Sequence, residues 1–165
     1  RCYHSQGDID AAQPLYERAL DIRERTYGAE CWVTAQSLDD LATCFFDKGD
    51  VEKARPLHER ALEIREKTLG PDHCFTADSL EKVALCHRKN GEPAEAIPLL
   101  KRALAIRDKN GGGDCWMTAD PLAALAACYR DQGDEKNARP LLTRALAITE
   151  KAFGADSPEI GRAHV

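Results

Sequence analysis

The sequence predicts an all-α protein built as a solenoid of antiparallel helix pairs. Three observations support this prediction. The segment PLYERALDIRERTYG recurs with small changes every 42 residues. Within each recurrence, apolar residues follow the i, i+3, i+4, i+7 spacing of an amphipathic helix. No segment shows the alternation of apolar and polar residues that marks a strand, and a fixed period of this length is typical of stacked repeats.

The four recurrences divide the chain into equivalent units. They begin at Pro14, Pro56, Pro98 and Pro140. One helix pair cannot bury its apolar face alone, so stacked pairs share a continuous core in which each unit contacts its neighbours. We expect one array over residues 1–165. Its units lie near 1–33, 34–75, 76–117 and 118–157, with the start of another helix at 158–165. Because the chain begins at Arg1 and ends within this helical pattern, we expect it to be a segment of a longer protein.

The first helix of the second unit has a clear apolar face. Thr34 is a candidate N-cap because its hydroxyl can accept a hydrogen bond from the first turn. Leu38, Leu41, Ala42 and Phe45 then follow at i, i+3, i+4 and i+7. This stripe predicts the surface that packs against the second helix of the pair.

A glycine and an acidic cap separate the two helices of this unit. Gly49 is suited to end the first helix and Asp50 to cap the second, which we expect to run from Val51 to about Leu69. Glu63 and Lys67 are placed for an i, i+4 ion pair on its outer face. The other units repeat this plan.

Composition and charge narrow the classes of function. The chain is 43% hydrophobic and 31% charged, with a formal net charge of −5. Nucleic-acid surfaces usually carry a basic stripe, so we expect no nucleic-acid partner. No apolar run approaches the roughly 18 residues of a membrane span, so we expect no membrane insertion.

The cysteine spacing follows the repeat and does not predict a disulfide framework. Four of the seven cysteines occupy one repeat position: Cys2, Cys44, Cys86 and Cys128. Equivalent positions of stacked helices lie about 8–10 Å apart, whereas a disulfide requires Cα atoms within roughly 7 Å. We therefore expect reduced thiols and a cytoplasmic location.

Motifs of catalysis and cofactor binding are missing from the sequence. The glycines at 111–113 are followed by Asp114 rather than by Lys and Ser or Thr, so they do not form a phosphate-binding loop. His73, Cys74, Cys31 and Cys115 fall on successive turns between units and lack the CxxC spacing of zinc sites. We expect no enzyme activity, no cofactor and no metal site.

The motif within each unit resembles the tetratricopeptide repeat. That motif reads W-x2-L-G-x2-Y…A-x3-F. The second unit has Leu38-x2-Leu41-Ala42-x2-Phe45…Ala54, and the third and fourth units keep the same gaps. The unit of 42 residues and the phrase ALEIREKTLGPDH resemble the long tetratricopeptide repeats of kinesin light chains, with similar units in nephrocystin-like and NB-ARC proteins. The resemblance implies a right-handed solenoid whose first helices line a concave groove.

The same resemblance implies which side chains face that groove. A ladder along the stack comprises His4, Phe46, Arg88 and Arg130. An acidic strip nearer the helix starts comprises Asp39, Asp78, Glu81 and Asp120. Further groove positions are Gln36, Leu85 and Lys89. We expect Arg88 and Arg130 to anchor carboxylates of a partner, with Phe46 and Leu85 as apolar contacts.

We therefore expect a module for protein–protein interaction or a scaffold that binds a peptide or partner segment in the groove. An alternative is a structural spacer or self-association module, which forms an end-to-end homodimer or serves a larger regulated protein such as a nucleotide switch. Trp32 and Trp116 share one unit position. We expect them to pack over the helix ends, with partner binding as the alternative.

Overall fold

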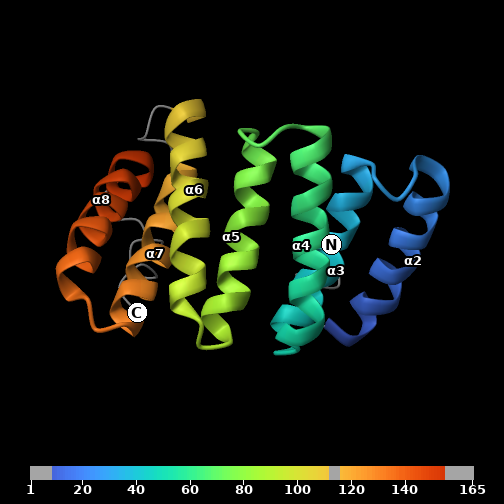
Figure 1. The fold of residues 1–165 in the computed structure, drawn as a ribbon, viewed down its shortest axis with the longest axis horizontal. Helices are drawn as coiled ribbons and strands as arrows, with labels where there is room; N and C mark the ends of the chain where they lie inside the picture. The colour runs from blue at the N-terminus through green and yellow to red at the C-terminus, as the bar shows by residue number, and fades with distance from the viewer. Residues whose placement is uncertain (1–8, 112–115, 155–165) are drawn as a thin grey trace.

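The computed structural model describes residues 9–111 and 116–154 and consists of antiparallel helices joined by short turns. Figure 1 shows them standing side by side in chain order. The helices are α2 (Ile9–Tyr27), α3 (Trp32–Asp47), α4 (Val51–Thr68), α5 (Cys74–Lys89), α6 (Pro93–Gly111), the short 3-10 helix η1 (Trp116–Thr118), α7 (Ala119–Asp131) and α8 (Glu135–Phe153). The predicted all-α solenoid of antiparallel helix pairs is confirmed.

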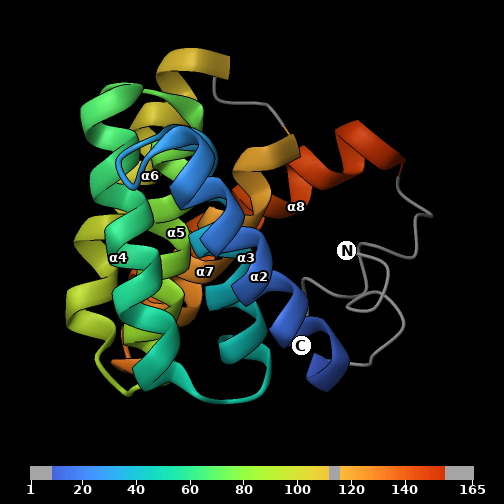
Figure 2. The same ribbon diagram turned by 90° about the vertical axis from the view of Figure 1, so that its right-hand side faces the viewer.

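The helices form two rows because each packs mainly against the helix before it and the helix after it. The pairs are α3 with α4, α5 with α6, and α7 with α8. Figure 2 shows α4 and α6 side by side on the outer face, with α3 and α7 on the inner side. The first helices α3, α5 and α7 therefore line the inner face, where the groove was predicted.

Small residues bring the two rows close together. Ala42, Ala84 and Ala126 occupy one repeat position and are fully buried. Leu38 and Leu80, four residues earlier, are fully buried as well. The predicted stripe of the first helix thus forms the core, whereas Phe45 at its end is half-buried.

The turn inside each pair follows the predicted chemistry. Gly49 has a φ of +86°, a left-handed conformation that residues with a Cβ rarely adopt. Asp50 caps α4, because its carboxylate accepts a hydrogen bond from the backbone N–H of Lys53 at 3.3 Å. The Lys67 ammonium lies 2.7 Å from Glu63, as the i, i+4 spacing predicted.

The prediction that Thr34 caps the first helix is wrong. The helix begins at Trp32, and the N-cap residue is Cys31. The hydroxyl of Thr34 is buried and donates to the carbonyl oxygen of Gly28 at 2.8 Å. Thr76 repeats this contact with Gly70 at 2.8 Å. The threonine thus ties α3 and α5 each to the end of the previous unit, a contact that local pattern does not reveal.

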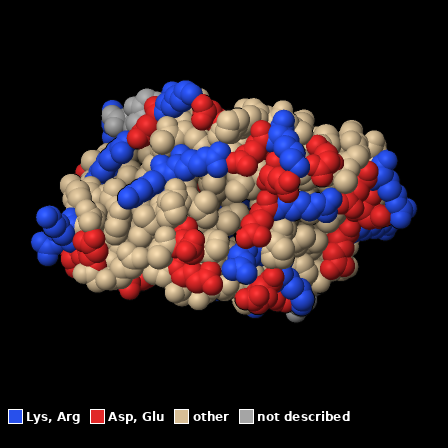
Figure 3. All heavy atoms as spheres, in the orientation of Figure 1, with Lys and Arg blue, Asp and Glu red and all other residues tan. Residues whose placement is uncertain are grey.

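Ion pairs on the outer face also follow the repeat. Three arginines of the second helices reach back to an acid of the previous unit: Arg60 to Glu24 at 2.8 Å, Arg102 to Glu66 at 2.6 Å and Arg144 to Asp108 at 2.8 Å. Acidic and basic side chains alternate over the face shown in Figure 3. Exposed pairs of this kind contribute little stability, so they add little to what holds the array together.

Candidate functional site

Three connected depressions follow the inner face of the first helices, and we call them together the groove. The first lies between α3 and α5, has a volume of about 260 Å³ and is lined by Thr43, Phe46, Asp47, His58, Lys82 and Leu85. The second has a volume of about 280 Å³ and is lined by Phe46, Leu85, Arg88, Lys89 and Asp131. The third lies against α7 and α8 and has a volume of about 520 Å³. Leu85 lines all three, so the depressions form one continuous surface.

We call the third depression the C-terminal pocket. Its lining is mostly apolar, with carboxylates at its edge. The lining residues are Glu81, Leu85, Trp116, Ala119, Asp120, Pro121, Ala123, Ala124, Ala145, Thr149 and Phe153.

The predicted ladder is only partly assembled. Phe46 and Arg88 meet in the second depression. Arg88 also donates from Nε to Asp131 in the next unit at 2.7 Å, so part of its charge is already paired. Arg130 is exposed and lies 3.8 Å from Glu135, outside the lining of the three depressions. His4 lies outside the described residues.

Lys89 belongs to the same depression as Phe46. Its ammonium lies 4.4 Å from the centroid of the Phe46 ring and donates to the Phe46 carbonyl oxygen at 3.1 Å. This cation–π contact holds the ring in place beside the groove. The apolar ring and the ammonium group of this depression are therefore in direct contact, although they come from neighbouring repeat units.

Most acids of the predicted acidic strip are already paired with basic side chains of the protein itself. Asp39 is fully buried, which corrects its assignment as a surface for a ligand. Asp78 and Glu81 accept hydrogen bonds from the same guanidinium, that of Arg107, at 2.7 and 2.6 Å. Asp120 is exposed and lies in the C-terminal pocket.

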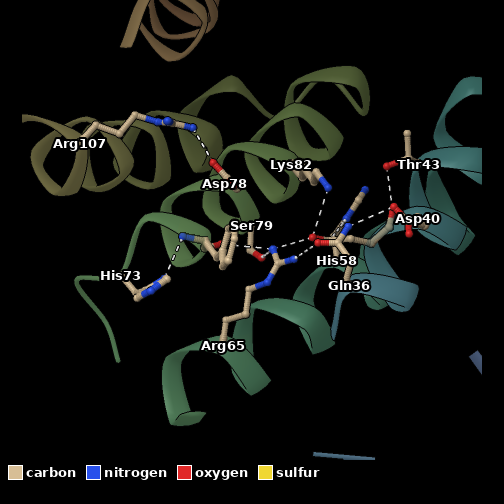
Figure 4. A network of polar contacts seen from close by, with 12 residues as sticks. Gln36, Asp40, Thr43, His58, Arg65, His73, Asp78, Ser79, Lys82 and Arg107 are labelled. Carbon is tan, nitrogen blue, oxygen red and sulfur yellow. Dashed lines mark hydrogen bonds and ion pairs between the residues drawn. The ribbon is translucent and has the colours of Figure 1, made fainter. Parts of the chain in front are cut away.

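Buried Asp39 is the centre of a polar network between three helices. Figure 4 shows its basic partners His58, Arg65 and Lys82 pointing toward one another. Its carboxylate lies 2.8 Å from His58 Nδ1, 2.6 Å from the Arg65 guanidinium and 3.2 Å from Lys82 Nζ. Gln36 is held within the same network, because its side-chain oxygen accepts from Arg65 at 3.2 Å. Buried His58 and half-buried Lys82 belong to this network and also line the first depression.

Electrostatics explain why the Asp39 carboxylate is tolerated in the core. Burial by itself raises the pKa of a carboxyl group. Here the hydrogen bond from His58 and the charges of Lys82 and Arg65 outweigh burial, so the pKa of Asp39 lies below its ordinary value. Asp39 therefore stays ionised and serves to orient the basic side chains around it.

Glu81 shows the opposite balance. Burial raises the pKa of its carboxyl group to about 7, although the hydrogen bond and charge of Arg107 act to lower it. The negative charges of Asp78 and Asp120 raise the pKa further. Glu81 thus changes charge near neutral pH in the lining of the C-terminal pocket.

An arginine ladder between units, formed by the second helices, was not predicted from the sequence. Arg23, Arg65 and Arg107 occupy one repeat position of the second helices. Arg23 and Arg65 each donate to a serine of the next unit, Ser37 at 2.8 Å and Ser79 at 2.6 Å. The spacing of 42 residues was visible in the sequence, but the contacts depend on how the units stack.

Cysteines and tryptophans occupy structural positions in the part of the chain that the structure describes. Its five cysteines are free thiols, and Cys44, Cys86 and Cys128 are buried. Trp32 is half-exposed at the start of α3, and Trp116 packs edge-on against Phe153 with ring centroids 6.2 Å apart.

The described residues contain neither a candidate metal site nor a candidate membrane-spanning helix. No group of three or more His, Cys, Asp or Glu side chains is arranged to hold a metal ion; Cys115 lies outside these residues. Among the described helices, none combines the length and the apolar composition that crossing a membrane requires.

Comparison with known families identifies the repeat. Two family models match, both described as tetratricopeptide repeat: one over residues 1–67 and 33–109, the other over residues 118–159. The chain belongs to the tetratricopeptide repeat family. Repeats of this family generally mediate protein–protein interaction, and their fold serves binding rather than catalysis. A search of curated proteins gave no significant match.

Solved structures place this tetratricopeptide array near kinesin light chain proteins, as the sequence resemblance implied. It is similar to BtubC (BKLC) from P. vanneervenii, with 26% identity and a TM-score of 0.82 over 94% of this chain. It is also similar to the nearly identical TPR-like repeats of a Podosopora anserina protein described as a kinesin light chain, with 27% identity and a TM-score of 0.81 over 99% of this chain. The chain spans 62% of the BtubC chain and 81% of the P. anserina chain.

Proposed function

We propose that this tetratricopeptide array binds an extended or helical segment of another protein in its groove. The observation that carries the proposal is the second depression, where Phe46, Leu85, Arg88 and Lys89 converge. This depression continues through Phe46 and Leu85 into the first. Apolar contact area beside fixed cations is the combination that gives a binding surface both affinity and orientation.

Each of these groups has a distinct role in the proposal. Leu85 is 36% exposed at the middle of the groove and offers an apolar contact. Arg88 uses its Nε donor for Asp131, which leaves its outer N–H groups for a carboxylate of the partner. Arg130 is the second proposed anchor, because it is exposed farther along the same row of first helices.

The test compares capture of partners by the unmodified chain and by groove variants. Lysate or a displayed peptide library is passed over immobilised protein, and bound segments are identified and titrated individually. We expect Leu85→Glu, and separately Arg88→Glu combined with Arg130→Glu, to weaken binding at least about tenfold, because the apolar contact or the charge anchors are lost.

A matched control is Arg139→Glu, a charge reversal on α8 outside the groove lining. Circular dichroism confirms that each variant is folded. Equal binding by all variants would show that the groove is not the site and would move it to the outer face.

Exposed apolar side chains on α2 favour a second candidate, self-association as a structural spacer or as part of a larger regulated protein. Leu15 and Ile22 are 51% and 52% exposed, whereas Ile64 at the position equivalent to Ile22 is buried. End-to-end contact between two copies would cover them. Sedimentation velocity over a hundredfold concentration range tests this. A constant monomer would eliminate it.

We also propose a cytoplasmic location, because buried free thiols such as Cys44 and Cys86 suit a reducing compartment. Imaging of the tagged chain in its source cells would test this assignment, and secretion would contradict it.

A further inference from the structure

Two members of the arginine ladder, Arg65 and Arg107, make equivalent contacts within their own units. The Arg65 guanidinium contacts Gln36 at 3.2 Å, and the Arg107 guanidinium contacts Asp78 at 2.7 Å. Gln36 and Asp78 are equivalent positions on the first helix. Each guanidinium also pairs with the carboxylate that follows three residues after that position. Arg65 pairs with Asp39 at 2.6 Å, and Arg107 pairs with Glu81 at 2.6 Å. The second helix thus supplies an arginine whose guanidinium lies against the first helix of the same unit.

The last unit keeps the acid and lacks the arginine. Asp120 stands at the position of Asp78, but Thr149 stands at the position of Arg107. Ala123 replaces the second carboxylate. These three residues line the C-terminal pocket of about 520 Å³. The pocket therefore opens where the preceding units place their own guanidinium.

The walls of the pocket suit an arginine side chain. Asp120 has no ion-pair partner among residues 9–111 and 116–154. Trp116 and Phe153 are 55% and 47% exposed at the edge, and aromatic faces attract guanidinium groups. Alanines such as Ala119 and Ala145 form an apolar floor for the methylene stem. A planar fork of donors matches a carboxylate better than the point charge of lysine does.

We propose that the C-terminal pocket binds an arginine side chain of the partner segment, in the place that Arg65 and Arg107 occupy in their own units. This inference rests on the proposed function, because a segment lying in the groove would present the side chain next to Leu85. The net charge of −5 adds a favourable field for a cationic residue.

A capped amino acid tests the pocket without any partner. The probe is Nα-acetyl-arginine amide, titrated into the full chain carrying Trp32→Phe, so that Trp116 is the tryptophan that reports. We expect saturable change in the Trp116 fluorescence with a Kd of about millimolar. The citrulline analogue has the same shape without the charge, and we expect it to bind at least about tenfold more weakly. Equal responses to both probes would overturn the proposal.

Two variants test the assigned groups. Asp120→Asn is expected to weaken probe binding about tenfold, whereas Glu95→Gln, on α6 away from the pocket, leaves it unchanged. Thr149→Arg places an arginine at the position that Arg65 and Arg107 hold in the arginine ladder. It is expected to abolish probe binding and to raise Tm by about 2–4 °C. Unchanged probe binding in Thr149→Arg would overturn the proposal even if the other variant misfolds.

A third variant distinguishes the source of the arginine. Arg162 is the arginine that follows α8 in the sequence. If Arg162→Ala binds the probe and the unmodified chain does not, the pocket belongs to an arginine of this chain, and the partner assignment is overturned. Loss of partner capture in Arg88→Glu combined with Arg130→Glu, two residues outside the pocket lining, with a normal probe titration would support the pocket. Normal capture in this double variant with a normal titration would count against the groove and not against the pocket.

Discussion

At the scale of single residues, the charge that the groove presents depends on which of its acidic and basic side chains are paired with other side chains of the protein. Asp39 has three basic partners and lies in the core, whereas Asp120 at the edge of the C-terminal pocket is exposed. Removal of one partner from a buried ion network usually costs several kcal/mol because it leaves a buried charge uncompensated. Asp39 therefore contributes to the shape of the groove, and the exposed acids and cations contribute to its chemistry.

Glu81 gives the array a dependence on pH. Its folded pKa of about 7 lies above the ordinary value of 4.5, so the folded chain binds more protons than the unfolded chain between these values. Stability should therefore fall as pH rises from about 4.5 through about 7. We expect the loss to be on the order of 2 kcal/mol in the free energy of unfolding.

Urea denaturation at several pH values between 5 and 8, with the unmodified chain and Glu81→Gln, measures this effect. The difference in free energy of unfolding between the two proteins should shift in favour of the variant as pH rises. A difference that stays constant over this range would contradict the raised pKa. Glu95→Gln, an exposed acid, is the control.

At the scale of elements, caps and turns fix where each helix starts. Asp50 and Asp134 occupy one repeat position and cap α4 and α8 in the same way, with hydrogen bonds from the backbone at 3.3 and 3.1 Å. Glu92 holds this position in the third unit, where it pairs with His87 at 2.7 Å. The cap is therefore a local signal that the sequence carries by itself.

Removal of one cap should have a local and modest cost. Asp134→Ala is expected to lower the free energy of unfolding by about 1 kcal/mol, because the backbone N–H of Asn137 loses its acceptor. Asp134→Ser should recover most of this loss, since serine also caps helices. Chemical denaturation followed by circular dichroism measures both. Equal losses in the two variants would show that the cap does not carry the effect.

At the scale of the whole molecule, the array is stabilised by contacts between neighbouring units. Leu80 of α5 is fully buried in a cluster with Ala77, Ala103 and Ile106, and Leu62 of α4 packs against it. Stability in such an array is approximately a sum over repeats and their interfaces. A defect in one interface should therefore spread only to its neighbours.

Leu80→Ala is expected to lower the stability by about 2–5 kcal/mol, because it leaves a cavity in this cluster. Hydrogen exchange should show the largest loss of protection in α5 and the helices beside it, with smaller changes in α2 and α8. Leu85→Ala on the exposed side of the same helix is the control and should change little. Uniform loss of protection along the chain would indicate one cooperative unit instead.

The sequence by itself determined the repeat, the helix pairs, the caps and the family, because these depend on interactions between residues close in the chain or repeated at a constant interval. Asp50, Gly49 and the stripe from Leu38 to Ala42 are local signals of this kind. The groove positions were predictable as helix positions, and Phe46, Leu85, Arg88 and Lys89 do meet in one depression.

Only the tertiary structure decided which of those groove residues are free to bind. Arg65 lies 29 residues from Gln36 in the chain, and Arg88 lies 43 residues from Asp131, yet each pair is in contact. Burial of Asp39 and the open space beside Thr149 likewise depend on how units stack. A charge on one helix is paired, buried or exposed according to the helices beside it, and the spacing along a single helix does not contain that information.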